Sequence, residues 1–138
     1  MEKITILITD DRIENIISLE EILAGENRVF LRATSGNEAL KLSLKNDDIG
    51  LIMLDVQMPD IDGLTVARHV RERITAKRPF IVAITAGVTP EDRQRCFDAG
   101  MDDFVMKPFK IATLKDVILK YARQVRPKQI KVPEESSV

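Results

Sequence analysis

Five side chains capable of chemistry stand where short apolar runs of this 138-residue sequence end. Asp10 and Asp11 follow the first run, and Asp55 follows the third. Thr85 ends the fourth run, and Lys107 follows the fifth. If the runs are strands of a parallel sheet, their carboxyl ends share one edge, which is where open sheets bind ligands. The sequence therefore predicts a site with three carboxylates, a hydroxyl and an ammonium group.

The crowding of three carboxylates predicts a metal ion. Like charges within a few ångströms raise one another's proton affinity and cost stability unless a cation joins them. Oxygen-only ligands favour a hard ion, and a site with few carboxylates and positions left for water and a phosphate favours Mg²⁺ over Ca²⁺. The segment 60–63, DIDG, resembles part of a calcium loop. It lacks the glutamate at the required later spacing, which makes calcium the weaker hypothesis.

Asp55 is the candidate nucleophile, because a carboxylate can attack phosphorus and form an acyl phosphate. The transferring group is metaphosphate-like and its oxygens carry the negative charge, so the reaction needs charge neutralisation more than acid–base catalysis. The metal ion and Lys107 would supply that neutralisation. Thr85 could donate its hydroxyl to a phosphoryl oxygen, and the small Ala86 beside it leaves that approach open.

Each of these residues also has a purely structural interpretation. The aspartates could cap a helix or start a turn, the threonine could satisfy a strand end, and the lysine could be solvated. Taken one at a time, these interpretations are favoured. Their joint occurrence favours a functional site, because a structural account does not explain why three acids crowd at one edge of a sheet.

Short β-rich apolar runs alternate five times with stretches of helical periodicity. The central runs 51–54 and 81–84 are apolar at consecutive positions, as expected of strands covered on both faces. Right-handed crossovers then give an α/β fold with a parallel five-stranded sheet, a flavodoxin-like doubly wound (βα)5 sandwich with strand order 2-1-3-4-5. The predicted strands are 4–9, 29–34, 50–54, 80–85 and 104–106.

Apolar stripes and end signals define the helices between these strands. Ser35 with Glu38 predicts a capping box, and Thr89 followed by Pro90 predicts a helix start. Gly100 is predicted to end a helix. Core-facing stripes are predicted at Ile13, Ile16, Leu19 and Leu23, at Leu64, Ala67, Val70 and Ile74, and at Ile111, Leu114, Val117, Ile118 and Tyr121.

Length and composition favour one soluble domain. Apolar residues make up 44%, charged residues 31%, and the net charge is -1, a balance that gives no indication of nucleic-acid or membrane binding. No signal peptide and no membrane-spanning run are evident, so a cytoplasmic location is expected. The lone Cys96 excludes an internal disulfide and is interpreted as a small buried residue. Residues 1–124 are predicted to form the domain, and 125–138 a polar tail or linker too short for an effector domain.

Several sequence blocks resemble those of bacterial response-regulator receiver domains, and the resemblance covers about residues 3–122. The aspartate pair after the first strand is one such block. The others are LDVQMPDIDG at 54–63, ITA at 84–86, AGMDDF at 99–104 and KPF at 107–109. Because the order and spacing of all these blocks are specific, the resemblance implies a receiver domain of a two-component phosphorelay.

The resemblance implies a role for each matching residue of the acidic site. Asp55 would be the phosphoacceptor. Mg²⁺ would be bound by Asp11 directly, by Asp10 mainly through water, by Asp55, and by the backbone carbonyl of Gln57. Lys107 would contact Asp55 and the phosphoryl group. The side chain of Gln57 stands where asparagine is frequent in the family, which puts the lifetime of the acyl phosphate in question.

The resemblance also implies a switch and a set of partners. Thr85 and Phe104 match the pair that couples phosphorylation to the surface of the fourth helix, fifth strand and fifth helix. Phe104 replaces a frequent tyrosine, so no hydroxyl fixes the position of its ring. The Lys107–Pro108 peptide would be cis. The phosphodonor would be a histidine kinase or a histidine phosphotransfer domain, the effector is unknown, and a phosphorylation-linked homodimer is a further expectation.

Other classes of function fit less well. An aspartyl-nucleophile phosphatase would need a second acid in a DxD pattern, whereas the sequence at 55–57 is DVQ. A flavodoxin-like cofactor carrier would place acids where a flavin phosphate needs a glycine- or hydroxyl-rich loop. A receiver-like module that binds partners without phosphorylation stays open, although every acidic and switch position is present. Apart from its own phosphorylation and slow dephosphorylation, the protein is not expected to act as an enzyme. His69 and residues 71–73 are interpreted as a solvated helix surface.

Overall fold

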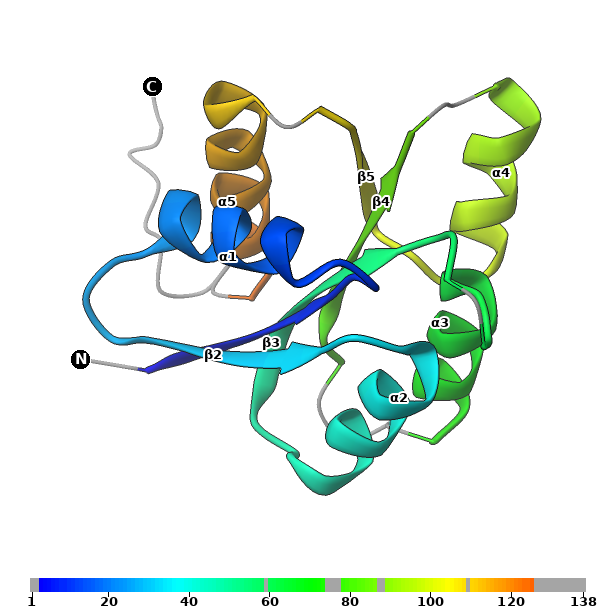
Figure 1. The fold of residues 1–138 in the computed structure, drawn as a ribbon, viewed down its shortest axis with the longest axis horizontal. Helices are drawn as coiled ribbons and strands as arrows, with labels where there is room; N and C mark the ends of the chain where they lie inside the picture. Colours follow the sequence, from blue (N-terminus) through cyan, green and yellow to red (C-terminus); the bar gives the residue numbers. More distant parts are fainter. Residues whose placement is uncertain (1–2, 59, 74–77, 87–88, 109, 126–138) are drawn as a thin grey trace.

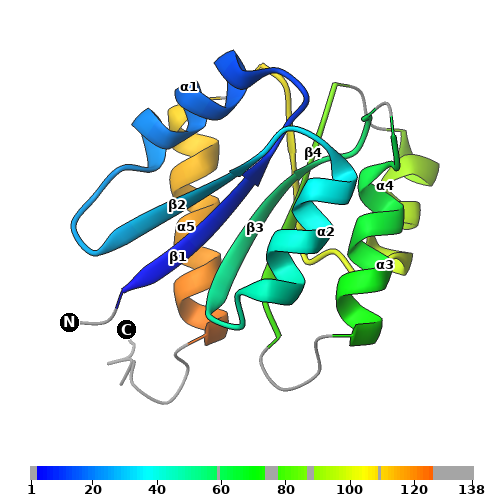
Figure 2. The same ribbon diagram turned by 60° about the horizontal axis from the view of Figure 1, so that its bottom comes forward.

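The computed structural model describes residues 3–58, 60–73, 78–86, 89–108 and 110–125. Its strands form one parallel sheet in the order β2-β1-β3-β4-β5, which confirms the predicted flavodoxin-like sandwich. Helices α1 and α5 cover one face of the sheet, and α2, α3 and α4 cover the other (Figures 1 and 2). The strands are β1 Ile4–Thr9, β2 Arg28–Ala33, β3 Ile49–Asp55, β4 Phe80–Thr85 and β5 Asp103–Met106. The helices are α1 Ile13–Leu23, α2 Gly36–Lys45, α3 Gly63–Arg73, α4 Pro90–Asp98 and α5 Ile111–Val125.

Two apolar cores, one on each face of the sheet, hold these layers together. Leu7 of β1 and Ile52 of β3 pack in the core beneath α2 and α3. Ile6 and Leu51, their neighbours along the same strands, pack in the core beneath α1 and α5. Because burying one such side chain is worth about 1.5–3 kcal/mol, the two cores fix the central strands firmly. The carboxyl ends of β1, β3 and β4 are thereby held in fixed relative positions.

Strand boundaries agree with the sequence prediction to within one residue. β1 and β4 match the prediction, β2 lies one residue earlier, β5 begins one residue earlier, and β3 is longer by one residue at each end. The extension of β3 concerns the site directly. Asp55 is the last residue of the strand, paired in register with Ile84 of β4, rather than the first residue of the following turn. Its backbone is therefore part of the rigid sheet.

Most of the predicted core-facing stripes are buried, but the first residue of two of them is not. Ile13 is 39% exposed and Ile111 is 58% exposed, so the prediction that both face the core was wrong. Each begins a helix just beyond the carboxyl edge of the sheet, and helical side chains lean toward the N-terminus. These two side chains therefore project past the sheet instead of onto it. Ile74 lies outside the described residues.

Helix α2 and helix α4 begin at polar caps, as predicted. The Ser35 side chain accepts a hydrogen bond from the Glu38 amide at 3.1 Å. The second half of the predicted capping box differs, because Glu38 Oε1 accepts from the Thr34 amide at 2.8 Å. At α4 the box is complete: Thr89 and Asp92 each accept a hydrogen bond from the other's backbone amide.

Helix α4 ends at Gly100, as predicted. The Gly100 amide donates to the Phe97 carbonyl at 3.0 Å, and the Met101 amide donates to the Cys96 carbonyl at 3.1 Å. These two bonds form a Schellman motif, which needs a residue with positive φ. Gly100 provides it, with φ at +99°.

Candidate functional site

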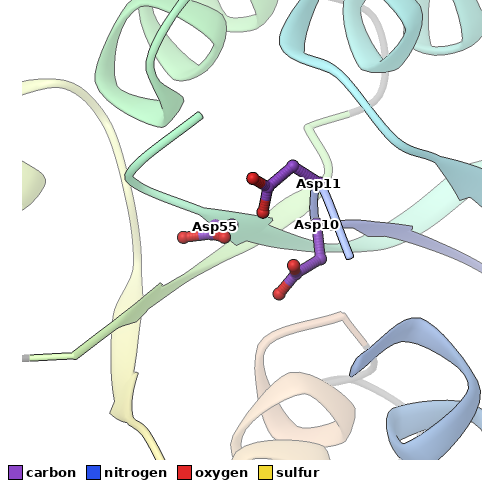
Figure 3. Close-up of side chains that lie close together, drawn as sticks. All are labelled: Asp10, Asp11 and Asp55. Atoms are coloured by element: carbon purple, nitrogen blue, oxygen red, sulfur yellow. The ribbon is translucent and has the colours of Figure 1, made fainter. Parts of the chain in front are cut away.

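The predicted acidic residues meet at the carboxyl edge of the sheet. One carboxylate oxygen from each of Asp10, Asp11 and Asp55 can be chosen so that all three lie within 4.8 Å of one another. Asp10 and Asp11 follow β1, and Asp55 ends β3 beside them (Figure 3). The side chains of Asp10 and Asp55 are buried, while Asp11 is exposed. The arrangement is a half-enclosed group of carboxylates that solvent reaches from the side of Asp11.

Asp10 is held by the start of α1 and by a lysine. Its Oδ1 accepts from the Arg12 amide at 2.9 Å, and both of its oxygens lie 3.2 Å from Asn15 Nδ2. Lys107 Nζ lies 3.1 Å from its Oδ2. These partners compensate a carboxylate that is 0% exposed. Asn15 was not identified from the sequence, although its place one turn into a predicted helix after an acidic pair was a usable signal.

Lys107 joins two strands of the sheet by bridging two carboxylates. Its Nζ lies 3.1 Å from Asp10 and 3.3 Å from Asp55. Burial alone would lower the pKa of Lys107, but hydrogen bonds and ion pairs with both aspartates outweigh it and raise the pKa. The lysine is therefore a permanent cation at the site. The peptide bond from Lys107 to Pro108 is cis, as predicted.

The burial of the Asp55 carboxylate is only partly offset by its hydrogen-bond and charge partners. Burial raises the pKa of its carboxyl group above the ordinary value, and the nearby Asp10 adds to the rise. The Gln57 amide, which donates to Oδ1 at 3.1 Å, and Lys107 oppose the rise without cancelling it. A buried carboxylate with a raised pKa gains from a second cation. The electrostatics of Asp55 therefore favour binding of a metal ion.

The described residues between β3 and α3, 56–58 and 60–62, include several that line the same cavity as Asp11 and Thr85. The base of this loop is fixed because the Val56 amide donates to the Ile84 carbonyl at 3.0 Å and the Gly63 amide donates to the Val56 carbonyl at 2.9 Å. A Cβ at Gly63 would lie 2.6 Å from the Asp55 carbonyl oxygen, so this close return needs glycine. Gln57 lies in this loop with an exposed side chain. Asp62 accepts from the Thr65 amide at 2.8 Å and caps α3.

The two predicted switch residues lie on neighbouring strands beside the acidic group. Thr85 is the buried last residue of β4, and Phe104 is partly buried on β5. The Phe104 ring packs edge-on against Phe97, with centroids 6.4 Å apart, and Arg93 lies 4.7 Å from its centroid. A cavity of about 580 Å³ lies beside it, lined by Asp11, Val56, Gln57, Met58, Asp62, Leu64, Thr85, Asp92, Arg93, Arg95, Cys96 and Phe104.

The donor atoms fit a hard divalent ion. Three carboxylates offer oxygen atoms, which Mg²⁺ prefers as ligands, and the exposure of Asp11 leaves access for water. The calcium alternative is disfavoured, because the carboxylates of Asp60 and Asp62 are both engaged by backbone amides at helix starts. Among the residues that the structure describes, the aspartate group is the one found that could hold a metal ion.

Two side chains discussed from the sequence lie outside the acidic site. Cys96 is buried on α4, as predicted, and burial raises the pKa of its thiol. His69 lies on α3 with a side chain that is 37% exposed and an Nδ1 atom 3.8 Å from Glu72. Neither belongs to the group of carboxylates. Within the described parts of the chain, no helix is long and apolar enough to cross a membrane.

These features define a doubly wound α/β protein with a carboxylate and lysine site at the carboxyl edge of its sheet. The family model of the response regulator receiver domain matches residues 6–119. The chain belongs to this family, and it is a receiver domain of the two-component signalling type. The family that the sequence blocks indicated is therefore confirmed.

Similar proteins include kinases and solved receiver domains. Hybrid signal transduction histidine kinase L of Dictyostelium discoideum is 42% identical over 123 residues, which cover 86% of this chain but 7% of the kinase. The receiver domain of a Pseudomonas aeruginosa PAO1 sensor histidine kinase, solved with a magnesium ion in its active-site cleft, is 28% identical with a TM-score of 0.76 over 86% of this chain and 97% of that one. The receiver domain of Saccharomyces cerevisiae Ssk1, solved with the histidine phosphotransfer protein Ypd1, is 25% identical with a TM-score of 0.81 over 91% and 94%.

Proposed function

We propose that this receiver domain accepts a phosphoryl group on Asp55 in a reaction that depends on Mg²⁺. The observation that carries the proposal is the buried Asp55 carboxylate, 3.3 Å from Lys107 Nζ and next to two further aspartates. In the transfer, an Asp55 oxygen attacks the phosphorus of a phosphohistidine and the P–N bond breaks. The electron pair stays with the imidazole, which takes up a proton from solvent. A bound Mg²⁺ would neutralise charge on the phosphoryl oxygens.

The side chains around Asp55 have distinct roles in this proposal. Asp10 and Asp11, with the backbone carbonyl of Gln57, would complete the metal site with Asp55. Lys107 would bind a phosphoryl oxygen, because its ammonium already lies within hydrogen-bonding distance of Asp55. Thr85, buried at the end of the adjacent strand, would donate its hydroxyl to the phosphoryl group. No acid–base residue is required, because charge neutralisation is the main need of this transfer.

The phosphorylated form would be read at the surface of α4, β5 and α5. If the Thr85 hydroxyl moves toward Asp55, space opens on the side of β4 that Phe104 can enter. The Phe104 ring now lies partly buried against Phe97 and Arg93, beside the cavity described above. Its inward movement would bury apolar area worth on the order of 1 kcal/mol, enough to shift a two-state equilibrium several-fold.

The phosphodonor would be a histidine kinase or a histidine phosphotransfer domain. Such a partner must cover the opening beside Asp11 to bring its phosphohistidine to Asp55. Ile13 and Ile17, one turn apart on α1, are 39% and 41% exposed, and α1 begins two residues after Asp11. We place the partner's apolar contact there. We further propose that residues 1–124 form the domain and that residues 125–138 are a tail or linker. The location would be cytoplasmic. The domain would catalyse no turnover beyond the gain and loss of the phosphoryl group on Asp55.

The phosphoryl-accepting role is tested by labelling. Incubation with acetyl phosphate and Mg²⁺ is expected to add one phosphoryl group, seen by intact mass, and Asp55→Asn is expected to abolish the addition. The asparagine keeps the shape of the side chain but removes the nucleophilic oxygen anion. Instability of the label in both acid and base distinguishes an acyl phosphate from a phosphoserine. Label that persists in the variant would assign the acceptor to another residue, and a folded wild type without label would favour an interaction module that works without phosphorylation.

The docking surface on α1 gives a second prediction. Ile17→Asp is expected to slow phosphotransfer from a phosphorylated histidine phosphotransfer protein by about tenfold or more, because a charge replaces a buried interface contact. The rate with acetyl phosphate should stay unchanged. Leu44→Asp is the matched control, since Leu44 is similarly exposed, at 45%, but lies on α2 on the other face of the sheet. Equal losses in both variants, or a loss with acetyl phosphate, would contradict the assignment of this surface.

A further inference from the structure

The β3–α3 loop is attached at a second point, far along the chain from its base. Asp60 Oδ1 accepts from the Gly36 amide at 3.0 Å, and Oδ2 accepts from the Asn37 amide at 2.8 Å. Both amides belong to the first turn of α2, where backbone donors have no partner within the helix. One carboxylate therefore uses both of its oxygens to join the loop to a helix 23 and 24 residues earlier in the chain.

The contact between loop and helix is also close in packing terms. Gly36 is buried, and a Cβ at this position would lie 2.5 Å from the Ile61 carbonyl oxygen and from Ile61 Cγ1. The backbone of the loop thus rests directly on the first turn of α2. Glycine at this position is what allows the Asp60 oxygens to reach the two amides.

Asp60 is separate from the acidic group that surrounds Asp55. It is not among the three aspartates whose oxygens converge, and its side chain faces the positive end of the α2 dipole instead. Hydrogen bonds from the Asn37 amide and then the Gly36 amide lower the pKa of Asp60 to about 2. The carboxylate is therefore ionised, and the attachment complete, throughout the range in which the protein would work.

The attachment has a consequence for the metal site. Gln57, whose backbone carbonyl is a proposed Mg²⁺ ligand, lies between the base of the loop at Val56 and the contact with α2 at Asp60. Fixed points on both sides of Gln57, at Val56 and at Asp60, restrict the directions open to its carbonyl more than a fixed point at Val56 alone would. Magnesium tolerates little departure from octahedral geometry, so the direction of the carbonyl controls affinity.

We propose that Asp60 is a positioning residue for the metal site: by binding the N-terminus of α2, it holds the backbone of Gln57 in place beside Asp55, whose carboxylate the Gln57 amide contacts. The inference rests on the proposed function for the identity of the metal, and it goes beyond that function in assigning a task to a residue that touches neither metal nor phosphoryl group. It also makes α2 a support of the site.

The test compares Asp60→Ala with Ser35→Ala. Both remove a side-chain cap from the same end of α2, since Ser35 accepts from the Glu38 amide, but only Asp60 reaches the loop. Asp60→Ala is expected to raise the Mg²⁺ concentration for half-saturation about tenfold, followed by amide chemical shifts at Asp11 and Asp55. Ser35→Ala is expected to leave it within twofold. Asp60→Asn, which keeps one acceptor oxygen, should fall between them and serves if the alanine variant does not fold.

A second readout needs no metal. In magnesium-free protein, hydrogen exchange at the Gly63 amide, which closes the base of the loop, is expected to be faster in Asp60→Ala and unchanged in Ser35→Ala. The inference would be overturned if the Mg²⁺ concentration for half-saturation rose equally in the two alanine variants. It would also be overturned if Asp60→Ala bound Mg²⁺ as tightly as the wild type does. A wild type that binds Mg²⁺ but takes no phosphoryl group would refute the proposed function while the variant comparison still decides the role of Asp60. A wild type that binds no Mg²⁺ would overturn both.

Discussion

Lys107→Met is expected to slow phosphorylation of Asp55 by about 100-fold or more and, at the same time, to make Mg²⁺ bind more tightly. The slower reaction follows from the loss of a cation placed to stabilise charge on the transferring group. The tighter binding follows from the present geometry. Lys107 Nζ occupies the space between Asp10 and Asp55, and its removal leaves three carboxylates around one ion. A lysine that only stabilised the fold would not, when replaced, tighten Mg²⁺ binding while slowing the phosphorylation of Asp55.

Stability gives the same variant a third signature. Without divalent ions, Lys107→Met should lower the free energy of unfolding by on the order of 2 kcal/mol, because the buried Asp10 loses its charge partner. The loss should be smaller than for a fully buried pair, since the Lys107 side chain is 26% exposed. Saturating Mg²⁺ should restore most of it, because an ion that binds only the folded state stabilises that state.

Lys110→Met is the matched control for these measurements. Lys110 is an exposed lysine three residues further along the chain, and no ion pair to the acidic group is found for it among the described residues. Urea unfolding with and without Mg²⁺, together with labelling by acetyl phosphate, provides all three quantities. Weaker Mg²⁺ binding in Lys107→Met would show that the lysine supports the metal site rather than competing with it.

Much of this site was predictable because the fold brings strand ends together. Consecutive apolar positions predicted central parallel strands, and parallel strands place residues that follow them at one edge. The positions of Asp10, Asp11, Asp55, Thr85 and Lys107 follow from that rule alone. The structure brings oxygens of the three aspartates within 4.8 Å of one another and Lys107 into ion pairs with Asp10 and Asp55. Their individual roles in metal binding and phosphoryl transfer stay predictions.

Contacts between loops and helices were not predictable in this way. The Asp60 bond to α2 depends on the exact path of a loop, and nothing in the local sequence says which amide its carboxylate will reach. Hydrophobic periodicity was also misleading at helix starts, where Ile13 and Ile111 fit the stripe but extend past the sheet.

The interpretation of residues 71–73 as a solvated surface was wrong for Arg71, whose side chain is 17% exposed. Charge alone did not reveal that its partner lies 31 residues away.

Arg71 joins three separate segments at the amino edge of the sheet. Its guanidinium donates to the Gly100 carbonyl at 2.8 Å, to the Pro79 carbonyl at 2.7 Å and to Asp102 at 2.7 Å. Its stem packs on Gly100, where an added Cβ would lie 2.6 Å from Arg71 Cγ. Burial lowers the pKa of Arg71, with the Asp102 charge opposing the shift. The C-terminal end of α4 and the starts of β4 and β5 are therefore tied to α3.

Arg71→Met is expected to lower the free energy of unfolding by about 3 kcal/mol, measured by urea denaturation at neutral pH. The methionine keeps most of the apolar stem, so the loss comes from two carbonyls left without their donor and from a carboxylate whose remaining partners are the Ile81 amide and the exposed Arg78. The control is Arg78→Met, because Arg78 binds the same carboxylate at 2.8 Å but is 59% exposed. Exposed pairs are worth about 1 kcal/mol or less, so this variant should stay close to the wild type.

The comparison of the two arginine variants also bears on switching. If α4 moves when Asp55 is phosphorylated, the Arg71 bond to Gly100 fixes the end of α4 that is further from the acidic group, and movement should concentrate at the Thr89 end. In Arg71→Met, hydrogen exchange should rise at Met101 and Asp102, whose amides close the α4 terminus and the start of β5. Equal losses of stability in the two variants would mean that the buried Arg71 contributes no more to stability than the exposed Arg78, although both bind Asp102. The anchor would then have to be sought in the apolar contacts of Cys96 and Ala99 with the core.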